Sequence, residues 1–196
     1  MRACSLVLPL FSRKLHGDNM KDESQIIILG TSHQIQCGSK KHSYEQIQNF
    51  RSLIRRICQN EGVKCIVEEM SNDGLSNHKV QNTIPFDVAT ELSIKHYYTD
   101  LTTEQLGCLN LSQGHVVQYS LSQPTNELKN HMRELLTNKL VHPIRERYWL
   151  ATILGINTWP TLLICGSEHG QNMQDLVNSV GYGPVYYWCK CCPREV

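Results

Sequence analysis

Three short aliphatic runs dominate the hydrophobic pattern of the chain. They cover residues 25–29 (QIIIL), 63–67 (VKCIV) and 161–165 (TLLIC). Runs of this length with little polar alternation are typical of strands buried on both faces, as in parallel sheets. Two weaker runs, residues 94–98 and 184–188, predict a fourth and a fifth strand.

Helical periodicity fills the segments between these runs. Apolar residues recur at helical spacing from Ile47 to Cys58, after a capping-box pattern at residues 43–46 and before Gly62, which predicts an amphipathic helix. Further helices are predicted over residues 85–92, 124–140, 143–154 and 171–180. Polar loops are predicted at residues 72–83 and 110–123. Strands that alternate with helices predict an α/β domain, with a largely parallel central sheet flanked by helices.

Composition and charge narrow the class of protein. The 196 residues, of which 40% are hydrophobic and 19% charged, suit one globular domain. The 19 Lys and Arg residues nearly balance the 18 Asp and Glu residues, and the basic residues do not gather in one stretch of the sequence. We therefore expect no nucleic-acid partner. No window approaches the roughly 18 apolar residues of a membrane helix, so we expect no membrane partner. We divide the chain into a leader (1–24), an α/β domain (25–188) and a Cys-rich tail (189–196).

The leader and the cysteines indicate in which cellular compartment the protein is located. The apolar run in the leader is short for a signal peptide. Two interpretations stay open: a weak organelle-targeting signal, or an unstructured leader with Met20 as the functional start of translation. Nine scattered cysteines do not describe a disulfide framework, and Cys58, Cys65 and Cys165 fit small buried hydrophobes. We therefore expect a reducing, cytoplasmic location. The cysteines at 189–192 fit either thiolate metal ligands or a flexible end.

Polar side chains follow three of the predicted strands. Residues 30–33 (GTSH) and 166–169 (GSEH) share the form Gly-x-x-His, and the strand at 63–67 ends in Glu68 and Glu69. The carboxyl ends of parallel strands share one edge, so His33, His169 and a glutamate should converge there. The glycines permit a sharp turn with positive φ and a close backbone approach. A single histidine after a strand is usually an ordinary loop residue, but the repeated pattern favours a functional site.

A charged helix predicts a fourth member of this site. At about 100° per residue, Arg147 falls in one arc with the apolar Ile144 and Tyr148, whereas Arg145 and Glu146 fall outside it. Burying an unpaired guanidinium costs several kcal/mol, so Arg147 should face Glu68, Glu69 or a ligand anion. The alternative is that Arg147 extends along the helix edge into water. The pattern does not decide which glutamate points inward, because adjacent strand residues face opposite ways.

Two histidines, a glutamate and an arginine suit two hydrolytic chemistries. In one, His33, Glu69 and His169 hold a divalent metal (Mn, Co or Zn) that activates water, while Arg147 stabilises the oxyanion. In the other no metal takes part, and a histidine oriented by Glu68 or Glu69 acts as general base. Glu168 is a reserve acid. The serines after the strands lack the Gly-x-Ser-x-Gly turn of a serine nucleophile.

This ordered set of motifs resembles a known superfamily. The resemblance covers Ile26 to Trp188 and rests on four motifs in order: a strand followed by GTSH, a strand followed by EE, a helix with Glu146-Arg147, and a strand followed by GSEH. In this order the chain is similar to TraB and GumN proteins, Tiki metalloproteases, erythromycin esterases and the haem-binding lipoprotein ChaN. The resemblance implies an erythromycin-esterase/ChaN-like fold. From Tiki-like peptidases it implies metal ligation by His33, His169 and Glu68 or Glu69. From the esterases it implies a histidine base, and other members bind haem.

The expected function is therefore hydrolysis of an ester, amide or peptide bond in a small molecule or peptide. The expected catalytic residues are His33, Glu68, Glu69, Arg147 and His169. A non-catalytic sensor that binds a metal, haem or an anionic ligand in the same cleft is the alternative from another class. An interaction module with a vestigial site is a third hypothesis, and a homo-oligomer is left open.

Overall fold

The protein is built on a five-stranded, all-parallel sheet. The computed structural model describes residues 24–109, 111, 127, 134–135 and 137–189. The strands lie in the order β3-β2-β4-β1-β5. Their bounds are β1 Ile26–Thr31, β2 Cys65–Glu68, β3 Lys95–Tyr98, β4 Thr161–Gly166 and β5 Val185–Trp188. The predicted α/β class and all five predicted strands are confirmed.

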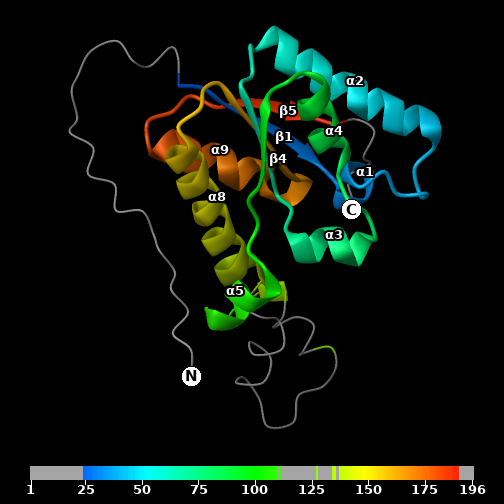
Figure 1. Ribbon diagram of the computed structural model, residues 1–196. Helices are drawn as coiled ribbons and strands as arrows, with labels where there is room; N and C mark the ends of the chain where they lie inside the picture. The colour runs from blue at the N-terminus through cyan, green and yellow to red at the C-terminus, as the bar shows by residue number, and fades with distance from the viewer. Residues whose placement is uncertain (1–23, 110, 112–126, 128–133, 136, 190–196) are drawn as a thin grey trace.

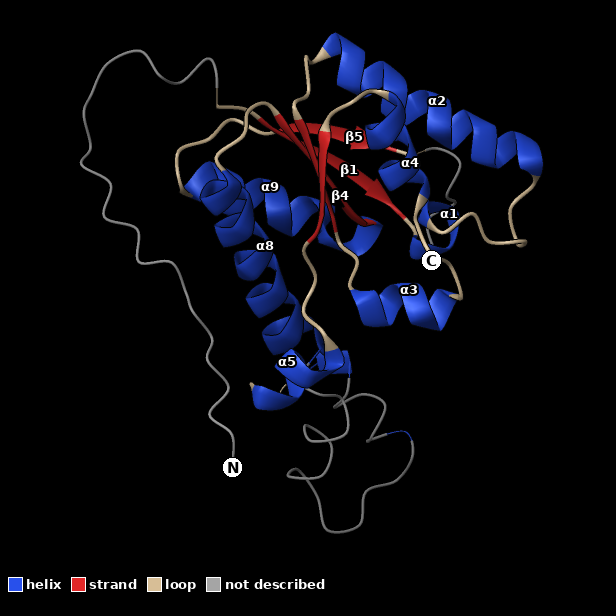
Figure 2. Ribbon diagram, in the orientation of Figure 1, coloured by secondary structure: helices blue, strands red, loops and turns tan. Residues whose placement is uncertain are grey.

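Helices cover both faces of the sheet (Figures 1 and 2). α2 and α4 pack on one face, and α8 and α9 pack on the other. The helix bounds are α1 His33–Gln36, α2 Tyr44–Asn60, α3 Asn72–His78, α4 Ile84–Glu91, α5 Thr103–Cys108, α8 His142–Ile156 and α9 Gly170–Ser179. A π-helical turn, Thr137–Val141, precedes α8, and a 3-10 turn, Ser167–His169, precedes α9.

Alternation along each strand divides the core into two halves. In β1, Ile27 and Leu29 pack toward α2 and α4, whereas Ile26 and Ile28 pack toward α8 and α9. Every residue of β1 and β4 is buried, as expected for strands covered on both sides. Each fully buried Ile or Leu contributes about 1.5–3 kcal/mol through burial of apolar surface. This packing makes the sheet a rigid base for the residues that follow the strands.

The register makes neighbouring strands finish together. Thr31 of β1 lies opposite Gly166 of β4, and Glu68 of β2 lies opposite Ile164 of β4 and Tyr98 of β3. The residues that follow β1, β2, β3 and β4 therefore start from one edge of the sheet.

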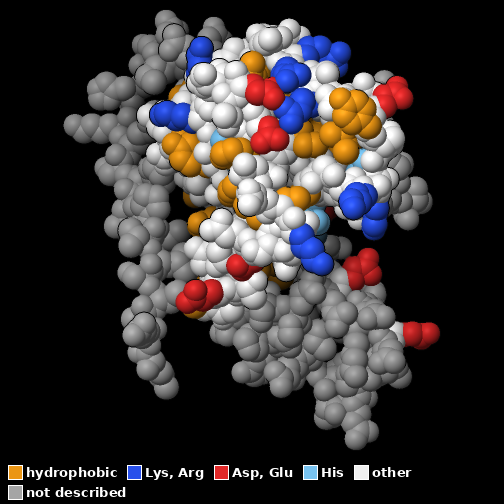
Figure 3. Space-filling model, turned by 45° about the vertical axis from the view of Figure 1, so that its right-hand side comes forward, with side chains coloured by type: hydrophobic (Ala, Val, Ile, Leu, Met, Phe, Trp, Pro, Cys, Tyr) orange, Lys and Arg blue, Asp and Glu red, His pale blue; other side chains and the backbone are white. Residues whose placement is uncertain are grey.

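The long helix forms as its sequence predicts. Ser43 and Gln46 make the reciprocal capping box of α2, and Gly62, with φ of +63°, follows the end of the helix. Ion pairs join α2 to α4, from Arg51 to Asp87 and Glu91. Figure 3 shows basic and acidic side chains mixed on the face that it presents, in keeping with the balanced composition.

Two helices differ from the sequence prediction. The prediction of a loop at residues 72–83 is wrong over residues 72–78, where Ser71 caps the helix α3 by accepting a hydrogen bond from the Gly74 amide and Leu75 is buried. Residues 79–83 lie outside helices and strands, as predicted. α5 is an additional helix that begins with a capping box at Thr102. The other predicted helices, at 85–92, 143–154 and 171–180, correspond to α4, α8 and α9.

Several predictions fall on residues outside the described ranges. These are the leader up to residue 23, nearly all of the predicted loop at 110–123, most of the predicted helix at 124–140, and the tail from residue 190. Cys58, Cys65 and Cys165 are buried, as the sequence predicts. Within the described ranges, none of the helices combines the length and apolarity that crossing a bilayer requires.

Candidate active site

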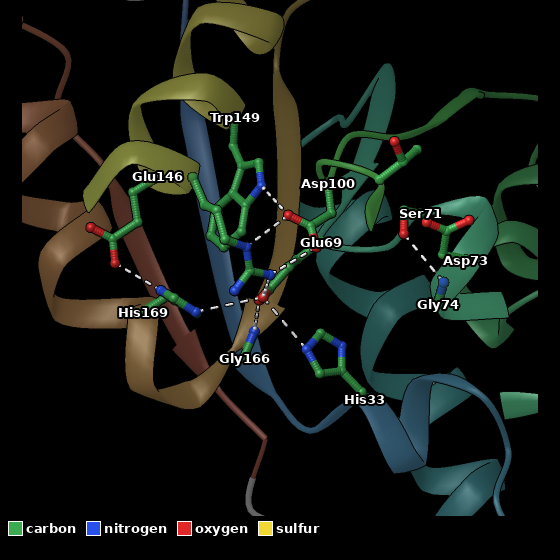
Figure 4. A network of polar contacts seen from close by, with 12 residues as sticks. His33, Glu69, Ser71, Asp73, Gly74, Asp100, Glu146, Trp149, Gly166 and His169 are labelled. Carbon is green, nitrogen blue, oxygen red and sulfur yellow. Dashed lines mark hydrogen bonds and ion pairs between the residues drawn. The ribbon is translucent and has the colours of Figure 1, made fainter. Parts of the chain in front are cut away.

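Glu69 lies at the centre of a cluster of polar side chains beyond the strand ends (Figure 4). Its side chain is 1% exposed. Its Oε1 atom lies 3.5 Å from Nε2 of His33 and 3.5 Å from Nε2 of His169, and it accepts a hydrogen bond from Nη2 of Arg145 at 2.5 Å. Its Oε2 atom accepts the Gly166 backbone N–H at 2.6 Å. One buried carboxylate thus contacts three other segments of the chain, which contribute His33, Arg145 and the pair Gly166 and His169.

The backbone after each strand places the two histidines. His33 is the first residue of α1, which Ser32 caps, and His169 lies in the 3-10 turn between β4 and α9. The expected positive φ at the motif glycines is wrong: Gly166 has φ of −54°, and neither Gly30 nor Gly166 is among the positive-φ glycines. A Cβ at Gly166 would lie 2.8 Å from the Glu168 carboxyl group, the end of an exposed side chain that can move aside.

His169 is held on three sides. Glu146 is buried, and its Oε1 atom lies 2.7 Å from Nδ1 of His169 and accepts the Asn172 amide at 3.2 Å. The His169 ring makes edge contacts with the rings of His142, at 4.3 Å between centroids, and Trp149, at 4.9 Å. Its Nε2 atom is buried and has no hydrogen-bond partner within the described residues. The surroundings therefore fix the ring and leave Nε2 available, directed at Glu69.

Arg145 is anchored by Asp100, which follows β3. Its Nε and Nη2 atoms donate to the two carboxylate oxygens of Asp100 at 2.9 and 2.8 Å. Trp149 donates from Nε1 to the same carboxylate at 3.2 Å, and its ring lies 5.1 Å from Cζ of Arg145. A paired fork of this kind fixes a guanidinium more firmly than a single contact. Arg145 thus reaches Glu69 as a pre-positioned positive charge.

The charges of the cluster shift the pKa of its members. Burial would lower the pKa of His33, but the hydrogen bond and charge of Glu69 outweigh it and raise the pKa to about 9. Burial would raise the pKa of Glu69, but His33, His169 and Arg145 together hold it well below its usual range. At neutral pH His33 is therefore an imidazolium and Glu69 a carboxylate. His33 is also the more exposed histidine, at 35%, whereas the His169 side chain is fully buried.

The structure brings together three of the five predicted catalytic residues: His33, Glu69 and His169. It places Glu68 on the opposite side of β2, where its Oε2 atom accepts the Thr83 hydroxyl at 2.6 Å and lies 3.0 Å from Nε2 of His96. Both glutamates are buried, and Glu69 is the one that faces His33 and His169. The reserve acid Glu168 is 56% exposed, with its carboxylate 3.9 Å from Nε2 of His169.

The expectation that Arg147 faces a glutamate or a ligand anion is wrong, and the structure shows the alternative, a side chain at the exposed edge of the helix. Arg147 is exposed and donates to the Pro143 carbonyl, one turn earlier in α8. Apolar residues lie on all sides of this helix, so the apolar arc around Ile144 and Tyr148 does not identify the buried face of the helix. The buried residues are Glu146, Trp149, Leu150 and Ile153, at the spacing i, i+3, i+4, i+7.

Sequence reasoning missed five residues of the cluster. They are Asp100, His142, Arg145, Glu146 and Trp149. Four of them lie at helical spacing, at positions 142, 145, 146 and 149, but apolar residues on every side of α8 keep this spacing from marking the inward face. Asp100 carries no comparable signal, since it is a single acid after a weak strand.

The donor set does not fit the expected divalent metal as it stands. Within the described ranges, no group of three or more His, Cys, Asp or Glu side chains is arranged to hold a metal ion. The Oε1 atom of Glu69 that faces both histidines is also bonded to the Arg145 guanidinium, which occupies a position that a cation would need and would repel it.

Comparison with known proteins adds no assignment: no family model, curated protein or solved structure matches the chain. The function is therefore inferred from the geometry of the cluster.

Proposed function

We propose that the protein is a hydrolase of the TraB/Tiki/erythromycin-esterase type that follows the histidine-base chemistry of the esterases, and that it cleaves an ester, amide or peptide bond with water activated by His169 and without a metal. The observation that carries the proposal is the shared carboxylate: Nε2 of His33 and Nε2 of His169 both lie 3.5 Å from one buried oxygen of Glu69. The two imidazoles meet at one point but have different surroundings, which suits an acid and base pair.

His169 has the surroundings of a general base. A carboxylate at Nδ1, such as that of Glu146, favours the tautomer with the proton on Nδ1 and leaves the lone pair on Nε2. The rings of His142 and Trp149 hold the imidazole plane in place. Nε2 can then accept a proton from water as the water oxygen attacks a carbonyl carbon.

His33 has the surroundings of the matching acid. Its raised pKa, about 9, keeps it protonated at neutral pH, and it is the histidine with exposed surface. An imidazolium at this position stabilises the oxyanion of the tetrahedral intermediate. It then gives its proton to the leaving oxygen or nitrogen as the C–O or C–N bond breaks. Transfer of the His169 proton to solvent and reprotonation of His33 restore both residues.

Glu69 and Arg145 position this pair and set its charge. Glu69 keeps His33 cationic, and Arg145, fixed by Asp100, balances the buried carboxylate. Because Nε2 of His169 is buried, water and substrate reach it only after a local rearrangement of the surrounding side chains. The central site residues are therefore His33, Glu69, Arg145, Glu146 and His169.

A panel of ester and amide substrates tests the proposal, with wild type compared with Glu69→Gln and Glu68→Gln. The second variant is a matched control, because Glu68 lies on the other side of the sheet. We expect turnover that is lost in Glu69→Gln and kept in Glu68→Gln. Equal turnover in wild type and Glu69→Gln, or absence of turnover across the panel, would contradict the proposal. The metal-dependent hydrolase stays a prediction, which metal analysis of the purified protein tests. The non-catalytic binding sensor also stays a prediction, and a Soret band that forms on adding haem would support it.

A further inference from the structure

His33 makes a side-chain contact at each of its two ring nitrogens. Its Nε2 atom lies 3.5 Å from Oε1 of Glu69, and its Nδ1 atom lies 3.2 Å from Oε1 of Gln36, three residues later in α1. Each ring nitrogen therefore faces one oxygen. A neutral imidazole carries a single N–H, whereas an imidazolium carries two. The two oxygens thus match the protonated ring that the proposed mechanism requires of His33.

Gln36 is a fully buried polar side chain whose amide is only half satisfied. It is 0% exposed, and its Nε2 atom has no hydrogen-bond partner within the described residues. A buried amide nitrogen without a partner costs stability, so an apolar side chain would serve the packing better. In the part of the chain that the structure describes, the contact with His33 is the one hydrogen bond of the Gln36 side chain. That contact, and not the packing, accounts for a glutamine at this position.

The charges around His33 determine which end of the Gln36 amide faces the ring. The groups that face His33 from other elements are Glu69 after β2, Arg145 on α8 and His78 on α3, whose ring lies 6.5 Å away. Burial and Arg145 lower the pKa of His33, but the hydrogen bonds to Glu69 and Gln36 and the charge of Glu69 raise it to about 9. The protonated ring is a donor at Nδ1, so the amide oxygen pairs with it and the amide nitrogen points away.

We propose that Gln36 is a positioning residue: its amide oxygen accepts the Nδ1 proton of His33 and so keeps the Nε2 proton directed at the cluster. The inference rests on the proposed hydrolysis and deepens it. α1 is a single turn capped by Ser32, and this turn brings Gln36 against the ring. His33 is 35% exposed, so without Gln36 its ring is free to turn and to lose the alignment of Nε2 with Glu69.

Histidine-selective NMR at neutral pH tests the contact without a substrate. We expect the Nδ1 proton of His33 to exchange with water about tenfold or more faster in Gln36→Met, which keeps the length of the side chain but lacks a strong acceptor. Gln36→Glu keeps an oxygen at this position and should keep the slow exchange. Equal exchange rates in wild type and Gln36→Met would overturn the contact.

Gln34→Met is the matched control. Gln34 is partly exposed and lies on the same turn, about 200° around the helix from Gln36, so the exchange rate should equal that of wild type. Acceleration in Gln34→Met as large as in Gln36→Met would overturn the specific role of Gln36. Gln36→Leu, measured in parallel, provides a second apolar variant, so that the test does not depend on the folding of one protein.

Turnover tests the positioning role, on any substrate cleaved in the ester and amide panel. We expect kcat to fall about tenfold or more in Gln36→Met with KM within about twofold of wild type, because the His33 proton is needed in the transition state. Unchanged kcat in a variant that has lost the slow exchange would overturn this role. The two failures are distinguishable: absence of turnover in wild type contradicts the proposed hydrolysis, whereas the exchange rates alone decide whether Gln36 holds His33.

Discussion

The Glu69 and Glu68 carboxylates, from consecutive residues, lie on opposite sides of the sheet. Glu69 faces α8 and contacts Arg145, His33 and His169, whereas Glu68 faces α4 and contacts Thr83 and His96. Alternation at the end of β2 thus creates two buried histidine–carboxylate pairings, of which one includes an arginine. The chain provides its own comparison between a proposed catalytic carboxylate and a structural one.

Replacement of each glutamate by glutamine should separate the two roles. In Glu69→Gln, His33 loses the charge that keeps it protonated, and we expect turnover of any cleaved substrate to fall by about 10²–10³-fold. In Glu68→Gln we expect turnover within about twofold of wild type, because its contacts do not reach the cluster. Steady-state kinetics measures both effects, with circular dichroism to verify that each variant is folded. Similar losses in the two variants would contradict the assignment.

Stability should depend on pH through His33. Its folded-state pKa, about 9, lies above the ordinary value of 6.5, so its contribution is fully present below about pH 6.5. That contribution should be lost as the pH rises through about 9, because the folded state then loses a proton that it had held more tightly. Urea denaturation between pH 6 and pH 10 measures it, with His33→Gln as comparison. The prediction fails if the difference in unfolding free energy between wild type and His33→Gln is constant over this range.

Arg145 and Arg147 are two positions apart but lie on different sides of α8, so their replacement should affect stability very differently. Arg145→Ala leaves the buried Glu69 and the largely buried Asp100 without their cation, and we expect a loss of about 3–5 kcal/mol in unfolding free energy. Arg147→Ala should change it by about 0.5 kcal/mol or less. Arg145→Lys should recover part of the loss, because lysine keeps the charge but not the fork. Equal effects of the two alanine variants in urea denaturation would show that the assignment of faces is wrong.

Metal removal should leave the protein unchanged. Arg145 donates a hydrogen bond to the Glu69 oxygen that faces both histidines, so that oxygen is not free to bind a metal ion. We therefore expect dialysis against EDTA to alter neither the melting temperature nor turnover. Elemental analysis of protein purified without a His tag should find no stoichiometric metal. Activity lost with EDTA and restored by Mn, Co or Zn would instead support the metal-dependent form.

The sequence predicts the sheet better than the site. Continuous aliphatic runs such as residues 161–165 identify the buried strands, and the capping box at residues 43–46 marks α2, because both signals are local. The convergence of His33, Glu69 and His169 follows from parallel strand ends, once the sheet is accepted. Motif spacing alone therefore recovers the centre of the cluster.

The remainder of the cluster depends on tertiary packing. α8 has apolar residues on every side, so its pattern does not reveal that Arg145 and Glu146 face inward while Arg147 faces solvent. Asp100 is recognisable only through its contacts with Arg145 and Trp149. α3 was missed because its capping serine lies in a polar stretch that also suits a loop.

Histidine-selective NMR titration of wild type and Glu69→Gln tests the central claim most directly, since it measures the charge that Glu69 imposes on His33 without a substrate. We predict that His33 titrates near pH 9 in wild type, and closer to its ordinary value of 6.5 in Glu69→Gln. Titration of His33 near pH 6.5 in both proteins would contradict the account of an acid and base pair joined by one buried carboxylate.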